Sequence, residues 1–139
     1  MTKKKKSNKL LHIFLIPGYL IIIYLGFSLI KRYYLFSNDD IEKRITIAHI
    51  QKIDPGAKTS PSFEYTFSFN GEDYHSEQFV DNNLRNKGFH LLKKEYIGKK
   101  FLVKFIKRNP NYSELLIDNP IKDSTLISPS EGWNKIPFY

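Results

Sequence analysis

The sequence predicts a membrane-anchored, mainly β protein. We expect one N-terminal transmembrane helix, followed by a small antiparallel five-stranded sheet with one short helix, either a partly open barrel or a curled sheet. Three observations predict this class. An uncharged run of 21 residues lies near the N-terminus, an alternating segment with a central Asn-Gly is typical of a hairpin, and two further β-rich segments follow a short helical pattern.

The uncharged run, residues 10–30, is the predicted membrane helix. It has no Asp, Glu, Lys or Arg over 21 positions, and a helix of that length spans about 30 Å, the thickness of a bilayer's hydrocarbon core. A core helix of a soluble domain would carry a polar stripe, which this run lacks. A cleaved signal peptide is the stronger alternative, because Gly26-Phe27-Ser28 has the small-x-small form of a cleavage site. The length of the apolar run favours an anchor.

The charges on either side of the run predict its orientation. The preceding leader carries five lysines, whereas only Lys31 and Arg32 follow the run closely. Basic flanks remain on the cytoplasmic side of a membrane. We therefore expect a single-pass protein with a cytoplasmic N-terminus, a domain on the non-cytoplasmic side, and the lipid bilayer as its first partner.

The net charge of +8 at first suggests a nucleic-acid binder. Of the 22 Lys and Arg residues, seven lie at or before Arg32, and the 15 beyond it stand against all 14 Asp and Glu residues. The domain is therefore nearly neutral and has little electrostatic attraction for a phosphate backbone. This makes nucleic acid the disfavoured partner.

Residues 62–79 carry the strongest β signal. Large apolar residues alternate with polar ones before Asn70-Gly71, which is the favoured two-residue type I′ turn. Such a turn pairs positions whose numbers sum to 141, so Glu64 should face Glu77. A like-charge pair of this kind predicts a solvated outer face.

Three further strands and one helix complete the predicted β domain. Residues 44–53 are rich in β-branched residues, but their apolar phase slips, which fits a strand with a bulge. Residues 99–106 form the fourth strand, and residues 112–117 form a closing strand after a turn at Asn109-Pro110. Between the hairpin and these strands, residues 88–98 have helical spacing and end in a glycine suited to a helix C-terminus.

These elements divide the chain into five parts. Residues 1–9 are the basic cytoplasmic leader, 10–30 the membrane helix, 31–44 a juxtamembrane connector, 45–118 the β domain and 119–139 a proline-containing tail. The aromatic residues of the tail either fold over an open edge of the sheet or form a docking peptide for a partner.

Two segments resemble a known group of proteins. From Gly98 the chain has a strand with Val103 and Phe105 two apart, then Asn109-Pro110, then Ser113 before an apolar strand; upstream, SPSFEYTF opens the hairpin. Together they are similar to small bacterial membrane proteins in which a β-rich domain of unknown function follows an N-terminal membrane helix. The resemblance implies a small barrel-like domain and no assigned activity.

The sequence offers no constellation for catalysis or metal binding. Its four histidines are scattered, with no two at i, i+4, and it contains neither a glycine-rich phosphate loop nor a G-x-S-x-G elbow. We therefore expect no enzyme activity, no metal and no cofactor.

Two functions remain open. The first is a non-catalytic β domain that binds a protein or envelope component, or another copy of itself as a homo-oligomer. The second is a membrane-tethered β-barrel that binds a small molecule, lipid or nucleic acid, and it needs Phe63, Tyr65, Phe67 or Tyr74 to be exposed in a groove. We favour the first, because alternating aromatic residues more often build a core.

A basic cluster and the aromatic tail form the candidate interaction surface. It consists of Lys93, Lys94, Lys99, Lys100, Lys104, Lys107, Arg108, Trp133, Phe138 and Tyr139.

Overall fold

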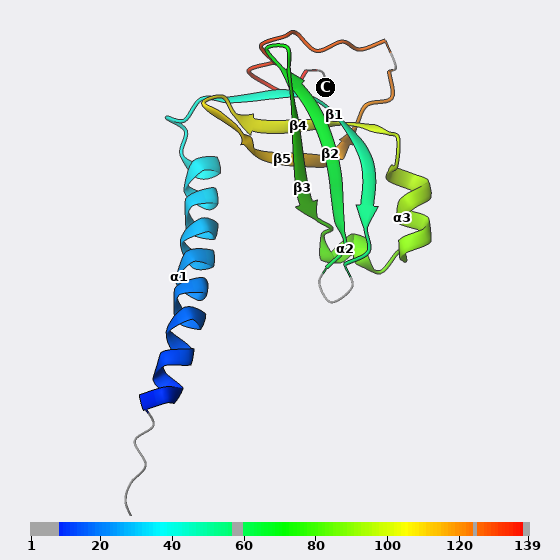
Figure 1. Cartoon of the computed structure of the whole chain (residues 1–139). Coiled ribbons are helices and arrows are strands. Elements are labelled where there is room, and N and C mark those ends of the chain that lie inside the picture. The colour runs from blue at the N-terminus through cyan, green and yellow to red at the C-terminus, as the bar shows by residue number, and fades with distance from the viewer. Residues whose placement is uncertain (1–8, 57–59, 124, 138–139) are drawn as a thin grey trace, which may run out of the picture. The chain divides into compact units, whose positions relative to one another are not determined.

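The computed structural model describes residues 9–56, 60–123 and 125–137, with side chains from Ile16 onward, in two compact units (Figure 1). The first contains the helix α1 (Lys9–Ser37), in which Ile16–Ser37 is a 22-residue stretch long and apolar enough to cross a membrane and not buried. The helix ends where Ser37 Oγ and the Asn38 N–H donate to carbonyls one turn earlier, at 2.8 and 3.0 Å. The lysines of the leader before Lys9 lie outside the described residues.

The second unit is a curled five-stranded antiparallel sheet with two short helices. The strand order is β3-β2-β1-β4-β5, which places β1 in the centre. The predicted helix followed by a five-stranded sheet is thus confirmed, as an apolar helix and an antiparallel half-barrel. Its elements are β1 (Lys43–Asp54), β2 (Ser62–Phe69), β3 (Glu72–Phe79), α2 (Asn82–Arg85), α3 (Phe89–Tyr96), β4 (Lys100–Ile106) and β5 (Asn109–Pro120).

The β2–β3 hairpin has the predicted register. Asn70 and Gly71 both adopt positive φ angles, 52° and 81°, as a type I′ turn requires. Glu64 faces Glu77, and every other pair in this ladder also sums to 141. The local turn chemistry therefore determines the pairing of all eight positions in the hairpin.

The predicted bulge in β1 is also confirmed. The register against β2 shifts between Ile50 and Lys52. This lies just after the slip in the apolar pattern, which falls between Ile47 and Ile50. A bulge bends a strand and increases its twist. Beside it, the Ile50 backbone also bonds with the segment that joins α3 to β4, donating to the Lys99 carbonyl at 3.2 Å and accepting from Gly98 at 2.9 Å.

The structure corrects the predicted β4–β5 turn and adds a helix. Lys107-Arg108 forms the turn, whereas Asn109-Pro110 begins β5, an edge strand in which proline is tolerated. Lys107 is held in the turn because its N–H donates to the Glu42 carbonyl at 3.1 Å. The predicted helix after the hairpin is found as α3, while the preceding α2 was missed because its four residues are too few for a periodic pattern.

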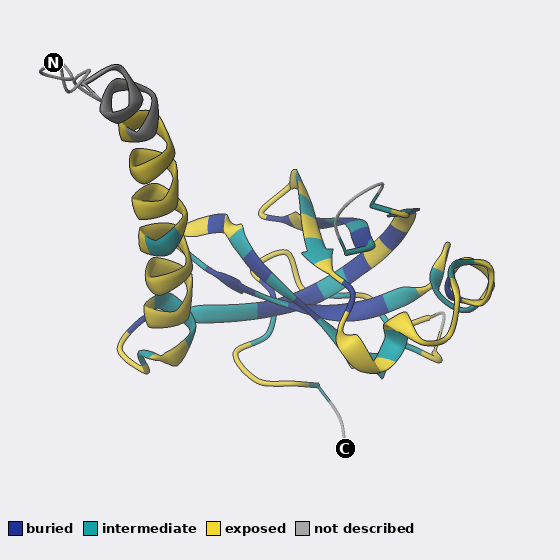
Figure 2. Cartoon of the chain, turned by 90° about the horizontal axis from the view of Figure 1, so that it is seen from below, coloured by how far each residue is buried: buried dark blue, intermediate teal, exposed yellow. Residues whose placement is uncertain are grey.

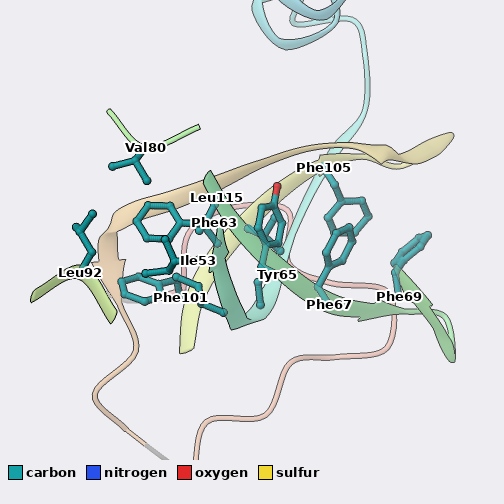
Figure 3. Close-up of a cluster of buried hydrophobic side chains, with 13 residues drawn as sticks. Ile53, Phe63, Tyr65, Phe67, Phe69, Val80, Leu92, Phe101, Phe105 and Leu115 are labelled. Atoms are coloured by element: carbon teal, nitrogen blue, oxygen red, sulfur yellow. The ribbon is translucent and has the colours of Figure 1, made fainter. Parts of the chain in front are cut away.

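One face of the sheet holds an aromatic-rich core (Figure 3). The ring centroid of Phe105 lies 5.2 Å from that of Phe67 and 4.9 Å from that of Phe69, distances at which an aromatic pair adds about 0.5–1.5 kcal/mol. Leu92 of α3 packs into the same cluster, and buried residues follow the strands in Figure 2. The buried members are Ala48, Ile50, Ile53, Phe63, Tyr65, Phe67, Phe69, Val80, Leu92, Phe101, Val103, Phe105 and Leu115.

Side chains join the two edge strands of the half-barrel. Gln78 of β3 donates from Nε2 to the Leu115 carbonyl at 3.1 Å, and its Oε1 accepts from the Leu115 N–H at 2.7 Å. Ser113 Oγ donates to Ser76 Oγ at 2.9 Å and lies 2.9 Å from the buried Tyr65 hydroxyl. Because all neighbouring strands are antiparallel, β3 and β5 point the same way. These polar contacts hold β3 against β5, along the line where the two edges of the curled sheet meet, which we call the seam.

Candidate interaction surfaces

The structure separates the predicted basic cluster into different parts of the β domain. Lys93 and Lys94 are exposed on α3, Lys99 precedes β4, and Lys100 begins it. Arg108 is exposed in the turn at the other end of β4. A strand of seven residues is about 20 Å long, so these side chains do not form one continuous patch.

Two members of the cluster are engaged in ion pairs. Lys104 Nζ lies 2.9 Å from Glu114 on the neighbouring strand. Lys107 Nζ lies 3.0 Å from Glu42, which also accepts from Arg44 at 2.6 Å. The Lys107 and Arg44 hydrogen bonds hold the pKa of Glu42 below its usual range. Lys104 and Lys107 thus make contacts within the sheet and its turn, whereas the α3–β4 corner and Arg108 present exposed basic side chains.

Charge is segregated along the β domain. Residues 60–84, which include the β2–β3 hairpin, contain five Asp and Glu and no Lys or Arg, whereas residues 85–108 contain nine Lys and Arg and one Glu. On the hairpin's outer face Glu64 and Glu77 lie opposite each other, and Lys52 Nζ lies 2.9 Å from Glu64. Hydrogen bonding to Glu64 raises the pKa of Lys52. Lys52 thus offsets the like-charge pair that the sequence predicted.

The tail crosses the sheet and pairs with β1. Trp133 donates to the Ile45 carbonyl at 2.7 Å and accepts from the Ile45 N–H at 2.9 Å. The Ser130 carbonyl accepts from the Asn70 N–H at 2.8 Å, and Ser128 Oγ accepts from Thr46 at 2.9 Å. We call residues 128–133 the strap. Phe138 and Tyr139, also part of the candidate surface, lie outside the described residues.

Gly132 explains how the strap approaches β1 so closely. Its φ angle is +67°, and a Cβ atom at this position would lie 2.7 Å from the Ile45 carbonyl oxygen. Both features exclude a larger residue without rearrangement. One feature of the sequence points to the strap, a glycine directly before the chain's single Trp, but no local pattern identifies Ile45 as the partner.

A pocket of about 640 Å³ lies between β4 and the chain that leads to the strap. Leu102, Ile121 and Leu126 are among the apolar residues that line it. It lies on the opposite face of β4 from the aromatic core, because Leu102 alternates with the core residues Phe101 and Val103. The sequence offered no signal for this pocket, since its walls come from segments that meet only in the fold.

The strand aromatics face the core. Phe63, Tyr65 and Phe67 are each exposed by 2% or less, and Tyr74 is partly buried against the same cluster, 5.6 Å from Phe67 between ring centroids. A stacking platform for a ligand needs exposed ring faces. These residues therefore contribute packing energy to the half-barrel.

His49, His75 and His90, the histidines whose side chains the structure describes, lie on different elements. These elements are β1, β3 and α3, and across the described ranges no three His, Asp or Glu side chains are placed to hold a metal ion. Partial burial, followed by the charge of Lys100, lowers the pKa of His49.

Comparison with family models, with curated proteins and with solved structures finds no match to this chain. The resemblance to bacterial proteins with a β domain of unknown function is supported only by the order of elements, an apolar helix followed by a five-stranded sheet.

Proposed function

We propose that this chain is a single-pass membrane protein that presents a small non-catalytic β domain for binding a protein or envelope component. The observation that carries the proposal is the helix Ile16–Ser37, which is apolar, 22 residues long and not buried. The β unit has a core of its own, drawn entirely from residues after Ile41. An unburied apolar helix of this length requires a membrane or an equivalent apolar partner.

The proposed orientation places the leader in the cytoplasm and the β domain on the other side. Five lysines before the helix outnumber Lys31 and Arg32 after it, and cytoplasmic flanks are the more basic ones. The candidate partners are then proteins, glycans or lipids of the cell envelope.

We further assign the half-barrel to the oligonucleotide- and oligosaccharide-binding type. Its strand order, with a helix between the third and fourth strands, supports this assignment. Barrels of this type bind ligands on the face of strands two and three. Here Glu64, Asp73 and Glu77 line that outer face, and carboxylates repel a phosphate backbone. This favours protein or envelope binding over nucleic acid.

The anchor is tested by fractionating cells that express the full chain with a C-terminal tag. We expect the intact chain in membranes after alkaline extraction, and a matched Ile22→Lys/Ile23→Lys variant in the soluble fraction. A mature chain that begins near Gly26-Phe27-Ser28 and is soluble would identify a cleaved signal peptide and contradict the anchor.

Orientation and binding are tested in the same cells. A reporter fused to the C-terminus should be active only outside the cytoplasm. A photo-crosslinker at Lys94 should capture one defined envelope component. The same crosslinker in a Lys93→Glu/Lys99→Glu background should capture less of it. A crosslinker placed at Glu114 should not capture that component. Activity of the reporter in the cytoplasm would reverse the orientation.

A further inference from the structure

Two neighbouring pockets lie beneath the chain that leads to the strap. The first, which we call the apolar pocket, is the one of about 640 Å³ described above, and the second, the polar pocket, has about 290 Å³. Leu126 lines both. Leu102 of the apolar pocket and Lys100 of the polar pocket are two apart on β4, so they point to the same face. The Ile121 N–H, in the apolar pocket, donates to the Lys100 carbonyl at 2.9 Å. One ligand can therefore occupy both pockets.

The apolar pocket has a lining suited to a hydrocarbon chain. Its volume lies within the range of about 300–1,000 Å³ that is typical of small-molecule sites, and such sites are mostly apolar. The apolar side chains around it come from β4, from the end of β5 and from the tail. They are Leu102, Pro120, Ile121, Leu126 and Pro137.

The two pockets differ in charge. In the apolar pocket Asp118 and Asp123 stand against Lys122. Hydrogen bonds from the hydroxyl and the N–H of Thr125, at 2.6 and 2.8 Å, lower the pKa of Asp123 and keep it charged. The polar pocket is lined by Lys100, and no Asp or Glu of the described part of the chain lines it. A ligand with an acidic group at one end is therefore oriented with that group in the polar pocket.

Lys100 and His49 lie together in the polar pocket. They pair across β4 and β1, and both line the pocket, beside the Thr66 hydroxyl. Partial burial, followed by the charge of Lys100, lowers the pKa of His49. The imidazole N–H and the Lys100 ammonium are both hydrogen-bond donors, and an anionic oxygen is the acceptor that forms the strongest bonds with such groups.

Lys100 differs from the next lysine on the same face of β4. Lys104 is paired with Glu114 at 2.9 Å, whereas Lys100 makes no ion pair with a carboxylate within the described ranges. Asp73 accepts from Ser68 Oγ at the hairpin side of the polar pocket, but it lies on β3, with β2 and β1 between it and β4. The Lys100 ammonium thus has capacity for an anionic ligand.

We propose that the two pockets together bind a single-chain amphiphile with a carboxylate head, of the fatty-acid type. The hydrocarbon chain lies in the apolar pocket, and the head pairs with Lys100, beside His49, in the polar pocket. This adds a small-molecule ligand to the protein or envelope partner proposed above. The supply of such amphiphiles from an adjacent bilayer rests on the proposed anchor, whereas the site itself lies wholly within the β unit.

Photolabelling of the full chain in membranes tests the site. The probe is dodecanoate with a diazirine at the end of its hydrocarbon chain, and mass spectrometry identifies the labelled peptides after irradiation. We expect label on the peptides that contain Leu102 and Ile121. Excess dodecanoate should remove most of this label, whereas the same excess of dodecanol, which lacks the charge, should not. This comparison uses the wild-type chain and so does not depend on the folding of any variant.

Two variants locate the head and the chain of the ligand. Lys100→Gln should lower labelling of the pocket peptides about tenfold, because a charge-assisted hydrogen bond is lost. The matched control is Lys94→Gln, which removes the same charge from an exposed position on α3 and should leave the labelling unchanged. Ile121→Trp, which places a larger side chain in the apolar pocket, should also lower it.

The pattern of label separates this site from the anchor. Label on α1 alone, with none on the pocket peptides, would overturn the ligand site while supporting the anchor. Equal competition by dodecanol and dodecanoate, or full labelling of Lys100→Gln, would also overturn the site. Label on the pocket peptides without label on α1 would support the site and contradict the anchor.

Discussion

The side chain of Gln78 binds the backbone of Leu115 as a neighbouring strand would, with the amide donating to the carbonyl and accepting from the N–H. This pair joins β3 to β5 at the seam of the half-barrel. Leu115 is buried in the core and Gln78 lies opposite the core residue Phe63, so the Gln78 side chain makes the hydrogen bonds that a backbone ladder between β3 and β5 would otherwise make.

Gln78→Met should destabilise the β domain, because it keeps the size of the side chain but removes both hydrogen bonds to Leu115. Leaving partly buried backbone groups unsatisfied costs about 1–3 kcal/mol. Urea unfolding of the full chain in detergent, followed by near-ultraviolet circular dichroism, measures the change. The matched control, Glu77→Gln on the outer face, should stay within about 0.5 kcal/mol of wild type. Equal stability of the two variants would show that the seam is not a stabilising contact.

Gly71→Ala should destabilise the hairpin, because Gly71 adopts a φ angle of 81°. Forcing an L-residue into this region costs about 1–2 kcal/mol. Asn70→Gly, which retains access to positive φ at the other turn position, should change the free energy of unfolding by less than about 0.5 kcal/mol. The same unfolding assay compares them, and a neutral Gly71→Ala would argue against the type I′ turn.

Gly132→Ala should release the strap while the core stays folded. The added methyl group meets the Ile45 carbonyl at 2.7 Å and also requires a φ angle of +67°. Trp133 is the only tryptophan, so its fluorescence should shift to the red as it becomes solvated. Gly98→Ala separates the effect of the steric contact from the effect of the positive φ angle, because Gly98 has a φ angle of +75° but open space around it. An unchanged spectrum for Gly132→Ala would mean that the strap tolerates a larger residue.

Stability should fall as the pH decreases below about 6.5, in part through His49. Partial burial and Lys100 lower the pKa of His49 in the folded domain, so the unfolded chain takes up the proton first. Above about pH 7.5 the residue is neutral in both states and contributes no pH dependence. Urea unfolding at pH 7.5 and 5.5 should show a smaller loss for His49→Gln, and an intermediate loss for Lys100→Gln. A larger loss of stability in His49→Gln than in wild type would mean that folding raises the pKa of His49 rather than lowering it.

The β domain shows which kinds of contact a sequence specifies. The Asn70-Gly71 turn and the alternation around it determine the hairpin register, because both act over neighbouring residues. The β4–β5 turn was misplaced because the contact that positions Lys107 comes from Glu42, 65 residues away in the sequence. The structure also adds contacts to two members of the candidate basic surface, because Lys104 pairs with Glu114 and Lys107 pairs with Glu42.

The sequence by itself determined the apolar helix, the hairpin, the bulged first strand and the absence of a catalytic motif. These follow from composition, period and turn chemistry, which are local properties. Only the tertiary structure decided that Gln78 joins β3 to β5, that Gly132 packs against Ile45, and that the basic residues lie apart. Each of these depends on how far the sheet curls, and curl is the sum of twist and bulging over five strands, which no single segment encodes.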